Sequence, residues 1–430
     1  MSFEVSSSLV ITLFAVYIYC TNGEKISKDL TLEPGHLQKF GTGRPSKLMD
    51  EVEGFPSAQE FFHNYVSVLR PLKMTGAAKL SRAFHQWTDD YFTSLQELDA
   101  EDVLIESRKK ENRTNPTSFM TLRQFVKIYN DTDQYMVNSV PRALRPDMVF
   151  PCPAQCESVV NGAVVDALMW FSSGGTKSVV HTDAVENINC LIRGDKEFVM
   201  IDPLLYGDKV DMDHPEGSYS DVDVDAVDYT KYPGLAEVEF VYVNMTAGDC
   251  LYIPYRWIHQ VRSYNSNLAV NIWWDHHKTA DIDSSLCPQK CDYDLTLDKV
   301  NYIGFGAALN SEESLKDHIL QMIGIHSEIT EKKFMEQFLG QDEPDESHAG
   351  VGYKDLLLQI FKLLDLNKDT ALTKQELNDA DKEIWENARD ILLRLETLLN
   401  EIEKDLEEEY DENPDAFDEE AEILETRDEL

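Results

Sequence analysis

The sequence predicts a mainly β protein with flanking helices, built on a β-sandwich or a closed barrel. Short segments rich in β-branched and aromatic residues follow one another between residues 167 and 274, and Gly, Pro or Asp separates them. Evenly spaced short strands of this kind are typical of sandwiches and barrels. The expected strands are Ala167–Phe171, Val179–Thr182, Asn187–Ile192, Glu197–Ile201, Val238–Asn244, Cys250–Ile253, His259–Ser263 and Leu268–Trp274.

Helical periodicity precedes the predicted strands. Residues 24–50 have no periodicity and are expected to be a poorly ordered lead-in. Ser57 would then cap a helix over Ala58–Leu69, which places its aromatic residues on one face. A second helix is expected over Ala83–Leu98.

An acidic loop is expected between Pro203 and Leu235, within the strand region. Asp221-x-Asp-x-Asp225 suggests a calcium loop, but an EF-hand that began at Asp221 would need Glu at its twelfth position, where Tyr232 stands. We therefore interpret the segment as a solvated acidic insertion beside the mouth of the barrel, where it could select a basic substrate segment.

The pattern His181-Thr-Asp183, followed later by His259, is the main candidate for a metal site. The two side chains of an HxD pair leave the same edge of a strand, and a second His from another strand completes a three-ligand face. Two imidazoles and one carboxylate suit non-heme Fe(II) oxygenases, because they leave positions open for substrate and dioxygen. On spacing alone, a histidine in an apolar strand is more often a core residue.

Longer motifs surround these residues. The segment Ala247-Gly-Asp-Cys-Leu-Tyr-Ile-Pro-Tyr-Arg-Trp-Ile-His259-Gln-Val resembles the GD-x-L-Y-I-P-x-x-W-x-H-x-V signature of JmjC-domain 2-oxoglutarate oxygenases. His181-Thr-Asp183, with Asn187 and Lys196 downstream, is similar to the first half of that family's site, and Leu268–Trp274 resembles its closing strand. The resemblance to the small JmjC hydroxylases extends loosely over residues 54–280.

The resemblance implies a double-stranded β-helix, the jelly-roll or cupin-like barrel, and a role for each matching residue. His181, Asp183 and His259 would ligate Fe(II). Lys196 would pair with the distal carboxylate of 2-oxoglutarate, with the hydroxyl of Ser178 bonding the same group. The amides that would orient the ligands or bond the oxoacid end are Asn187 and Asn271. Without the resemblance, Lys196 would be interpreted as a solvated hairpin residue.

The charge of the chain limits its partners. With 430 residues, two or three domains are expected, and the formal net charge is −40. Nucleic acid and anionic membranes would repel such a chain, so neither is expected as a partner.

The two ends of the sequence predict residence in the lumen of the endoplasmic reticulum. Residues 1–23 contain an apolar run too short to span a membrane, and are expected to be a signal peptide. Arg427-Asp-Glu-Leu430 is close to the KDEL address read by the retrieval receptor. Sequons for N-glycosylation begin at Asn112, Asn130 and Asn244, although Asn244 is expected to be inaccessible inside the barrel.

Six cysteines follow the predicted signal peptide, an even number that suits an oxidising compartment. Cys152-Pro-Ala-Gln-Cys156 and Cys287-Pro-Gln-Lys-Cys291 could each close locally or could pair with each other. Cys190 and Cys250 lie in expected core strands, where we interpret them as buried free thiols.

A second motif lies beyond the barrel. Asp365, Asn367, Asp369, Ala371 and Glu376 occupy positions 1, 3, 5, 7 and 12 of a calcium-binding EF-hand loop. Helices are expected on both sides, over Tyr353–Leu364 and from Thr373 to Asn378. Position 6 holds Thr370 where Gly is usual, which makes the fold a firmer expectation than tight Ca²⁺ binding. No second loop is seen in the sequence to pair with it.

A long helix is expected after the loop. Apolar residues from Ile384 to Ile402 step by three and four, so this helix could pack back on the EF-hand or join two chains in a homodimer. The acidic tail beyond it is expected to be solvated. The expected division is a signal peptide (1–23), a helical N-terminal part (54–140), the barrel (141–280), a helical extension and linker (281–350), the EF-hand with the long helix (351–400), and the tail (401–430).

Together these features predict a luminal Fe(II)/2-oxoglutarate-dependent oxygenase that hydroxylates a side chain of a secretory-pathway protein and carries a calcium-binding EF-hand. The alternative is a catalytically silent barrel that serves as a calcium-binding scaffold or folding factor.

Overall fold

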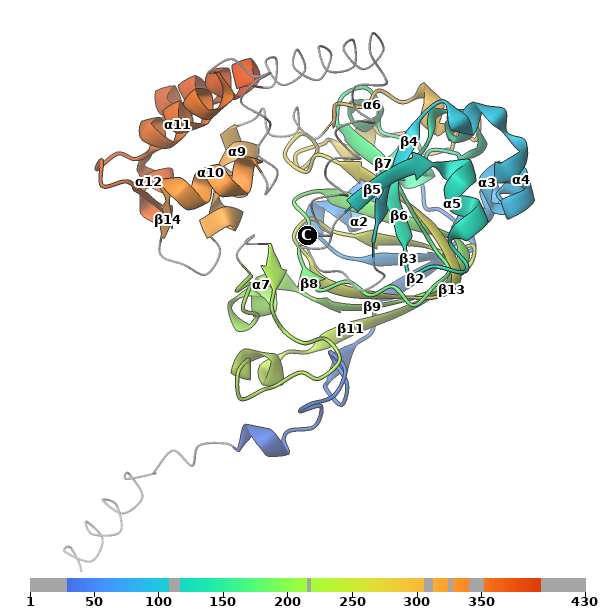
Figure 1. The fold of residues 1–430 in the computed structure, drawn as a ribbon, viewed down its shortest axis with the longest axis horizontal. Helices are drawn as coiled ribbons and strands as arrows, with labels where there is room; N and C mark the ends of the chain where they lie inside the picture. Colours follow the sequence, from blue (N-terminus) through green and yellow to red (C-terminus); the bar gives the residue numbers. More distant parts are fainter. Residues whose placement is uncertain are drawn as a thin grey trace, which may run out of the picture.

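A computed structural model describes residues 29–107, 117–214, 218–304, 312–323, 328–339 and 352–395. The predicted signal peptide, the sequon at Asn112, and the tail with its retrieval motif lie outside these residues. The strands gather in one β-rich body, and the helices α9 to α12 form a second group (Figure 1). In the described part of the chain, no helix is both long and apolar enough to cross a membrane.

The β-rich body is organised on two long antiparallel strands, β9 (Glu186–Ile201) and β13 (Ile258–Trp274), which pair along their whole lengths. The first half of β9 also pairs with β12 (Cys250–Ile253), and its second half pairs with β11 (Phe240–Thr246). One layer therefore has the order β2-β3-β12-β9-β13-β7-β6-β4-β5, and the other has the order β1-β11-β9-β13-β8-β10. Such a pair of layers is a β-rich fold of the jelly-roll kind.

The remaining strands complete the two layers. They are β1 (Ser46–Lys47), β2 (Asp50–Glu53), β3 (Leu72–Thr75), β4 (Asp102–Glu106), β5 (Thr117–Thr121), β6 (Tyr135–Ser139), β7 (Val164–Ser172), β8 (Val180–His181) and β10 (Tyr219–Ser220). Several of them lie within residues 54–140, which were expected to be helical.

Each long strand replaces two expected short ones, because the predicted breaks are bulges and not turns. Gly194 has φ +77°, and a Cβ atom there would lie 2.6 Å from the carbonyl oxygen of Ser266. The β9–β13 register shifts near the same point, between Tyr264 and Leu268. A bulge bends a strand and sharpens its twist, which lets β9 and β13 pass from one layer into the other. Lys196 therefore lies within a continuous strand and not in the hairpin that its sequence context alone would suggest.

Helices of the N-terminal part cover the outer face of the larger layer. Phe171 of β7 contacts the rings of Phe92, Phe125 and Tyr129, which come from α4 (Asp89–Ser94) and the region of α5 (Leu122–Ile128). The helix predicted from Ala58 begins there, capped by Ser57, but α2 ends at Asn64.

The single helix expected over Ala83–Leu98 is wrong. It is divided into α3 (Arg82–Gln86), α4 and a 3-10 turn over Gln96–Asp99. The division occurs where the hydroxyl of Thr88 accepts the backbone N–H of Tyr91 and starts a new helix.

The insertion after β9 is packed, which corrects the expectation of a solvated loop. It contains α7 (Pro203–Tyr206) and β10, and its apolar residues cover the outer face of the smaller layer. The buried members from this segment are Val210, Val222, Val224, Val227, Tyr229, Tyr232, Leu235 and Ala236. Asp225 forms ion pairs with Lys177 and with Arg262, the latter at 2.8 Å. Valines that alternate with aspartates therefore hold the insertion on the barrel. Phe40, in the expected lead-in, is buried in the same cluster.

Three disulfides join all the cysteines after residue 28. Cys152 pairs with Cys291 and Cys156 with Cys287, so the two motifs pair with each other. Cys190 of β9 pairs with Cys250 of β12 across neighbouring strands, and the expectation of free thiols there is wrong.

The second group of helices has its own core and a small sheet. One short strand precedes the second helix in each of two helix pairs, α9 (Glu312–Ile323) with α10 (Glu331–Leu339) and α11 (Tyr353–Leu364) with α12 (Lys374–Asp379). β14 (Glu328–Thr330) and β15 (Ala371–Thr373) pair antiparallel, with Ile329 opposite Leu372. The 365–376 loop thus has a partner that its sequence did not reveal, and part of segment 281–350 supplies it.

The helix after α12 is described from residue 382 to residue 395. Its residues Trp385, Ala388, Leu392 and Leu395 are buried in the core of the same group. Of the two predicted arrangements, packing within the chain is the one that this stretch shows. A homodimer through the C-terminal helices stays a prediction.

The Cys190–Cys250 disulfide should contribute measurably to stability. A Cys190→Ala/Cys250→Ala double variant should lower the free energy of unfolding by about 2–4 kcal/mol, because the link constrains the unfolded chain. Urea unfolding under non-reducing conditions measures the change. An unfolding midpoint equal to that of the wild type would contradict the expected role of this bond.

Candidate functional site

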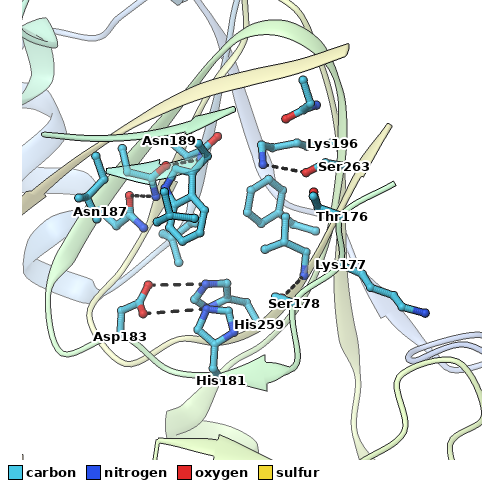
Figure 2. A pocket seen from close by; sticks show the side chains of 18 of the residues that line it. Thr176, Lys177, Ser178, His181, Asp183, Asn187, Asn189, Lys196, His259 and Ser263 are labelled. Atoms are coloured by element: carbon cyan, nitrogen blue, oxygen red, sulfur yellow. Dashed lines mark hydrogen bonds and ion pairs between the residues drawn. The ribbon is translucent and has the colours of Figure 1, made fainter. Parts of the chain in front are cut away.

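The two histidines of the candidate metal site lie side by side because of strand pairing. His181 ends β8 and stands directly opposite His259 of β13, with ring centroids 4.2 Å apart. Asp183 follows β8 and turns its carboxylate toward both rings (Figure 2). Its oxygens lie 4.0 Å from Nε2 of His181 and 3.7 Å from Nε2 of His259.

Hydrogen bonds orient both imidazoles for metal binding. Nδ1 of His181 lies 3.0 Å from the carbonyl oxygen of Val179, and Nδ1 of His259 lies 2.8 Å from that of Trp257. A carbonyl can only accept, so each Nδ1 carries the proton and each Nε2 keeps a lone pair for a ligand. Burial and the neighbouring His181 lower the pKa of His259 to about 4, which keeps that ring neutral at physiological pH.

These three residues are the candidate metal centre in the described part of the chain. Their ligand atoms lie within 4.8 Å of one another, and no other His, Cys, Asp or Glu cluster among the described residues meets the same condition. The set is two nitrogens and one carboxylate on one side, the arrangement that Fe(II) oxygenases use.

Lys196 lies in the same cavity with its charge unpaired. The side chain is 6% exposed, and its ammonium donates to the hydroxyl of Ser263, 2.9 Å away on the paired strand β13. Among the described residues, none places a carboxylate within ion-pair distance of it. Burial alone lowers the pKa of Lys196 to about 8. An isolated buried ammonium is costly for the protein, so it is suited to a ligand that brings a negative charge.

Ser178 lies beside the histidines, on the segment that leads into β8. Its hydroxyl accepts the backbone N–H of Val261 at 2.9 Å, and this leaves the hydroxyl hydrogen free to be donated. Ser178 and Lys196 both line the cavity that contains the metal-site residues.

A row of amides crosses the floor of the cavity. Asn271 donates to Asn187 at 3.1 Å and accepts from Asn189 at 2.5 Å, so the three side chains orient one another (Figure 2). Asn187 and Asn271 were predicted for the site, whereas Asn189 was not. The alternation of β9 could have indicated it, because residues 187 and 189 face the same side of a strand.

The cavity measures about 290 Å³, near the lower end for small-ligand sites. Aromatic and polar residues line it, and sequence reasoning did not select several of them: Tyr135, Trp170, Thr176, Asn189, Tyr219, Ser263 and Trp273. Tyr219 comes from the insertion and stacks on His181, with ring centroids 6.0 Å apart. The order of these lining residues in the sequence does not indicate that they share one cavity, because they come from different strands.

The predicted calcium ligands lie together in the loop between α11 and α12. Asp365 accepts the backbone N–H groups of Asp369 and Thr370, and Asp369 accepts that of Ala371. Glu376 accepts from the backbone of Asn367 and caps α12 through Thr373. The carboxylates of the loop are thus bonded to its own backbone N–H groups.

Comparison with known proteins identifies the class of this fold and site. Residues 58–280 match the family of the cupin-like domain, and the chain belongs to that family. The matched range contains strands β3 to β13 and every residue of the candidate metal site.

Among curated proteins, the chain is similar to several JmjC-domain proteins. It is 24% identical over 252 residues to Jumonji C domain-containing protein 5 of Drosophila melanogaster, covering 57% of this chain and 58% of that protein. It is 27% identical over 154 residues to the human bifunctional peptidase and (3S)-lysyl hydroxylase JMJD7, covering 31% of this chain and 48% of the relative.

A further relative is named for a different reaction. The chain is 28% identical over 258 residues to tRNA wybutosine-synthesizing protein 5 of Gallus gallus, covering 54% of this chain and 79% of that protein. Its relatives therefore include a named hydroxylase and a tRNA-modifying protein, and the similarity does not by itself select a substrate.

Replacing Lys196 by Met should stabilise the protein at neutral pH. Between about pH 8 and 10.5 the folded wild type has released the proton of Lys196 while the unfolded chain still binds it, so the free energy of unfolding rises through this window. Below this window the buried charge remains. At pH 7 the free energy of unfolding of Lys196→Met should therefore exceed that of the wild type by about 1–3 kcal/mol.

The difference in the free energy of unfolding between Lys196→Met and the wild type should shrink toward pH 10. Urea unfolding at several pH values measures it. Lys39→Met, at an exposed lysine, is the matched control and should show no such pH dependence. A constant difference for Lys196→Met across the window would contradict an unpaired charge at this position.

Proposed function

We propose that this protein is an Fe(II)- and 2-oxoglutarate-dependent oxygenase that hydroxylates a protein side chain. The observation that carries the proposal is the unpaired ammonium of Lys196 in the same cavity as the His181, Asp183 and His259 triad. A metal ion and a small dicarboxylate together would satisfy every charge that this cavity leaves open. The resemblance to JmjC oxygenases points to the same pair of cofactors.

The residues fit these groups. His181, Asp183 and His259 would hold the iron, since their ligand atoms already converge. Lys196 would pair with the distal carboxylate of 2-oxoglutarate, and the free hydroxyl hydrogen of Ser178 could bond the same group. When bound, iron and 2-oxoglutarate supply dioxygen activation and oxygen insertion into a C–H bond, with 2-oxoglutarate converted to succinate and carbon dioxide.

The chain's own contribution is to bind and orient the iron and 2-oxoglutarate and to shield them from water. The amide row of Asn187, Asn189 and Asn271 fixes the floor of the cavity, so that a bound oxoacid meets groups already in place. Tyr219 of the insertion covers His181. The proposed substrate is a basic segment of a secretory-pathway protein, on the support of the net charge of −40 and the acidic insertion beside the cavity.

The endoplasmic reticulum lumen is the proposed location. Three disulfides join the six cysteines after residue 28, which suits an oxidising compartment. Asn130 and Asn244 are exposed, so both sequons are open to glycosylation, and the expected burial of Asn244 is wrong.

Succinate formation from 2-oxoglutarate by the full chain with Fe(II) tests the reaction. The wild type should form succinate, and His181→Ala should lose more than about 100-fold of this activity. The reason is that removing even an outer partner of a metal ligand typically costs 10–100-fold in metal affinity or activity. His63→Ala, at an exposed histidine, is the matched control and should retain activity.

The outcome also separates this proposal from its alternative. If the wild type neither turns over 2-oxoglutarate nor binds it, the oxygenase proposal fails and a catalytically silent, calcium-linked scaffold or folding factor becomes the better account.

We also propose that the 365–376 loop is an EF-hand that binds Ca²⁺. Its support is the ligand spacing, the flanking helices α11 and α12, and the β14–β15 pairing, which is the way that two such loops usually join. Thr370 at position 6 has φ +70°, a conformation that disfavours a β-branched residue. Strain at this turn should weaken the affinity.

Thr370→Gly should therefore raise Ca²⁺ affinity, by about 5-fold or more for a strain of order 1 kcal/mol, as measured by titration calorimetry. Glu376→Gln should weaken binding strongly, and Asp355→Asn, an exposed residue of α11, should not. Identical affinities for Thr370→Gly and the wild type would show that the turn is not strained.

A further inference from the structure

Glu186 carries a carboxylate that has no contact with solvent. It starts β9, three residues after Asp183, and its side chain is 0% exposed. One oxygen accepts the phenolic O–H of Tyr252 at 2.7 Å and the backbone N–H of Tyr255 at 3.0 Å. The other lies 2.7 Å from Nδ1 of His276. Such complete pairing of a buried carboxylate requires a reason, since burial of a charge is costly.

The partners of Glu186 lie in or beside the turn that leads into His259. Tyr252 is in β12, and residues 254–257 connect β12 to β13, where His259 is the second residue. Arg256, within this turn, has φ +60°, and its backbone N–H donates to the carbonyl oxygen of Asp183 at 3.0 Å. His276 stacks on Tyr255, with ring centroids 4.1 Å apart and planes 6° from parallel.

This arrangement matters because strand pairing does not place Asp183. The two histidines are fixed opposite each other by the β8–β13 register, but β8 ends at His181. The pairing with β10 continues by one backbone bond, from the N–H of Thr182 to the carbonyl oxygen of Ser218 at 3.0 Å, and Asp183 lies beyond it, between β8 and β9. The hydrogen bond from the backbone N–H of Arg256 links Asp183 to the turn. Glu186 binds the same turn through the backbone N–H of Tyr255.

We propose that Glu186 is a positioning residue for the metal site. By holding Tyr252 and the backbone of Tyr255, it sets the turn whose Arg256 N–H fixes Asp183 relative to His259. The inference rests on the proposed function, because it assumes that the triad binds a metal. It does not place Glu186 in contact with metal, cosubstrate or substrate.

Co(II) binding to the full chain tests this, with the dissociation constant and the visible absorption spectrum of the bound ion as readouts. Glu186→Ala should weaken Co(II) binding by about 10–100-fold and alter the spectrum, as loss of outer partners of metal ligands does. Glu186→Gln, which can still accept from Tyr255, should recover part of the affinity. Tyr252→Phe should show a smaller loss of Co(II) affinity.

Asp147→Asn is the matched control. Asp147 is also a buried carboxylate, and it also accepts from aromatic side chains, Trp87 at 3.1 Å and Tyr91 at 2.6 Å. Its partners Trp87, Tyr91 and Arg82 lie outside the turn and the triad, so Asp147→Asn should bind Co(II) as the wild type does even if it unfolds at a lower urea concentration.

The outcomes are distinguishable. Wild-type Co(II) affinity and spectrum in folded Glu186→Gln and Tyr252→Phe would overturn the positioning role while leaving the metal site intact. An equal loss in Asp147→Asn would overturn it too, because the effect would then reflect general destabilisation. If the wild type bound no Co(II) at all, the proposed metal site itself would fail.

Discussion

The continuous pairing of β9 with β13 is the constraint on which the rest of this structure depends. These strands run through both layers and carry most of the candidate site, namely Asn187, Asn189, Lys196, His259, Ser263 and Asn271. His181 is on β8, which pairs with β13. Lys196 faces Ser263 and Asn189 faces Asn271 because of this pairing, one pair on each side of the register shift. A slip by one residue would turn these side chains out of the cavity.

The bulge at Gly194 gives the pairing its functional consequence. In a regular strand, Asn187 and Lys196 would face opposite sides, because one position is odd and the other even. Both line the cavity because, next to Gly194, the pairing steps from Arg193 opposite Leu268 to Leu191 opposite Ala269, and this extra residue on β9 shifts the alternation by one. The amide row and the ammonium, nine residues apart on one strand, therefore converge on the same space.

The packing around the barrel then preserves what the pairing creates. Helices of the N-terminal part bury the outer face of the larger layer, and the insertion buries that of the smaller one. The Cys190–Cys250 disulfide ties β9 to β12 next to Asn189. With both faces covered, burial lowers the pKa of Lys196 to about 8 and that of His259 to about 4, so the ammonium is held without its water shell and His259 stays neutral.

The amino-acid sequence alone determined the strand-rich class, the ligand spacing around His181 and His259, and the helix–loop–helix at Asp365, because these depend on local patterns. The tertiary structure decided the rest. Ser263, Asn189 and Tyr219 join the cavity through pairings between strands distant in sequence, and the three disulfide links depend on which cysteines meet in space. No sequence motif singles out Glu186, which precedes the strand expected over Asn187–Ile192. Only folding, by removing it from water and surrounding it with Tyr252, Tyr255 and His276, made its carboxylate a structural link.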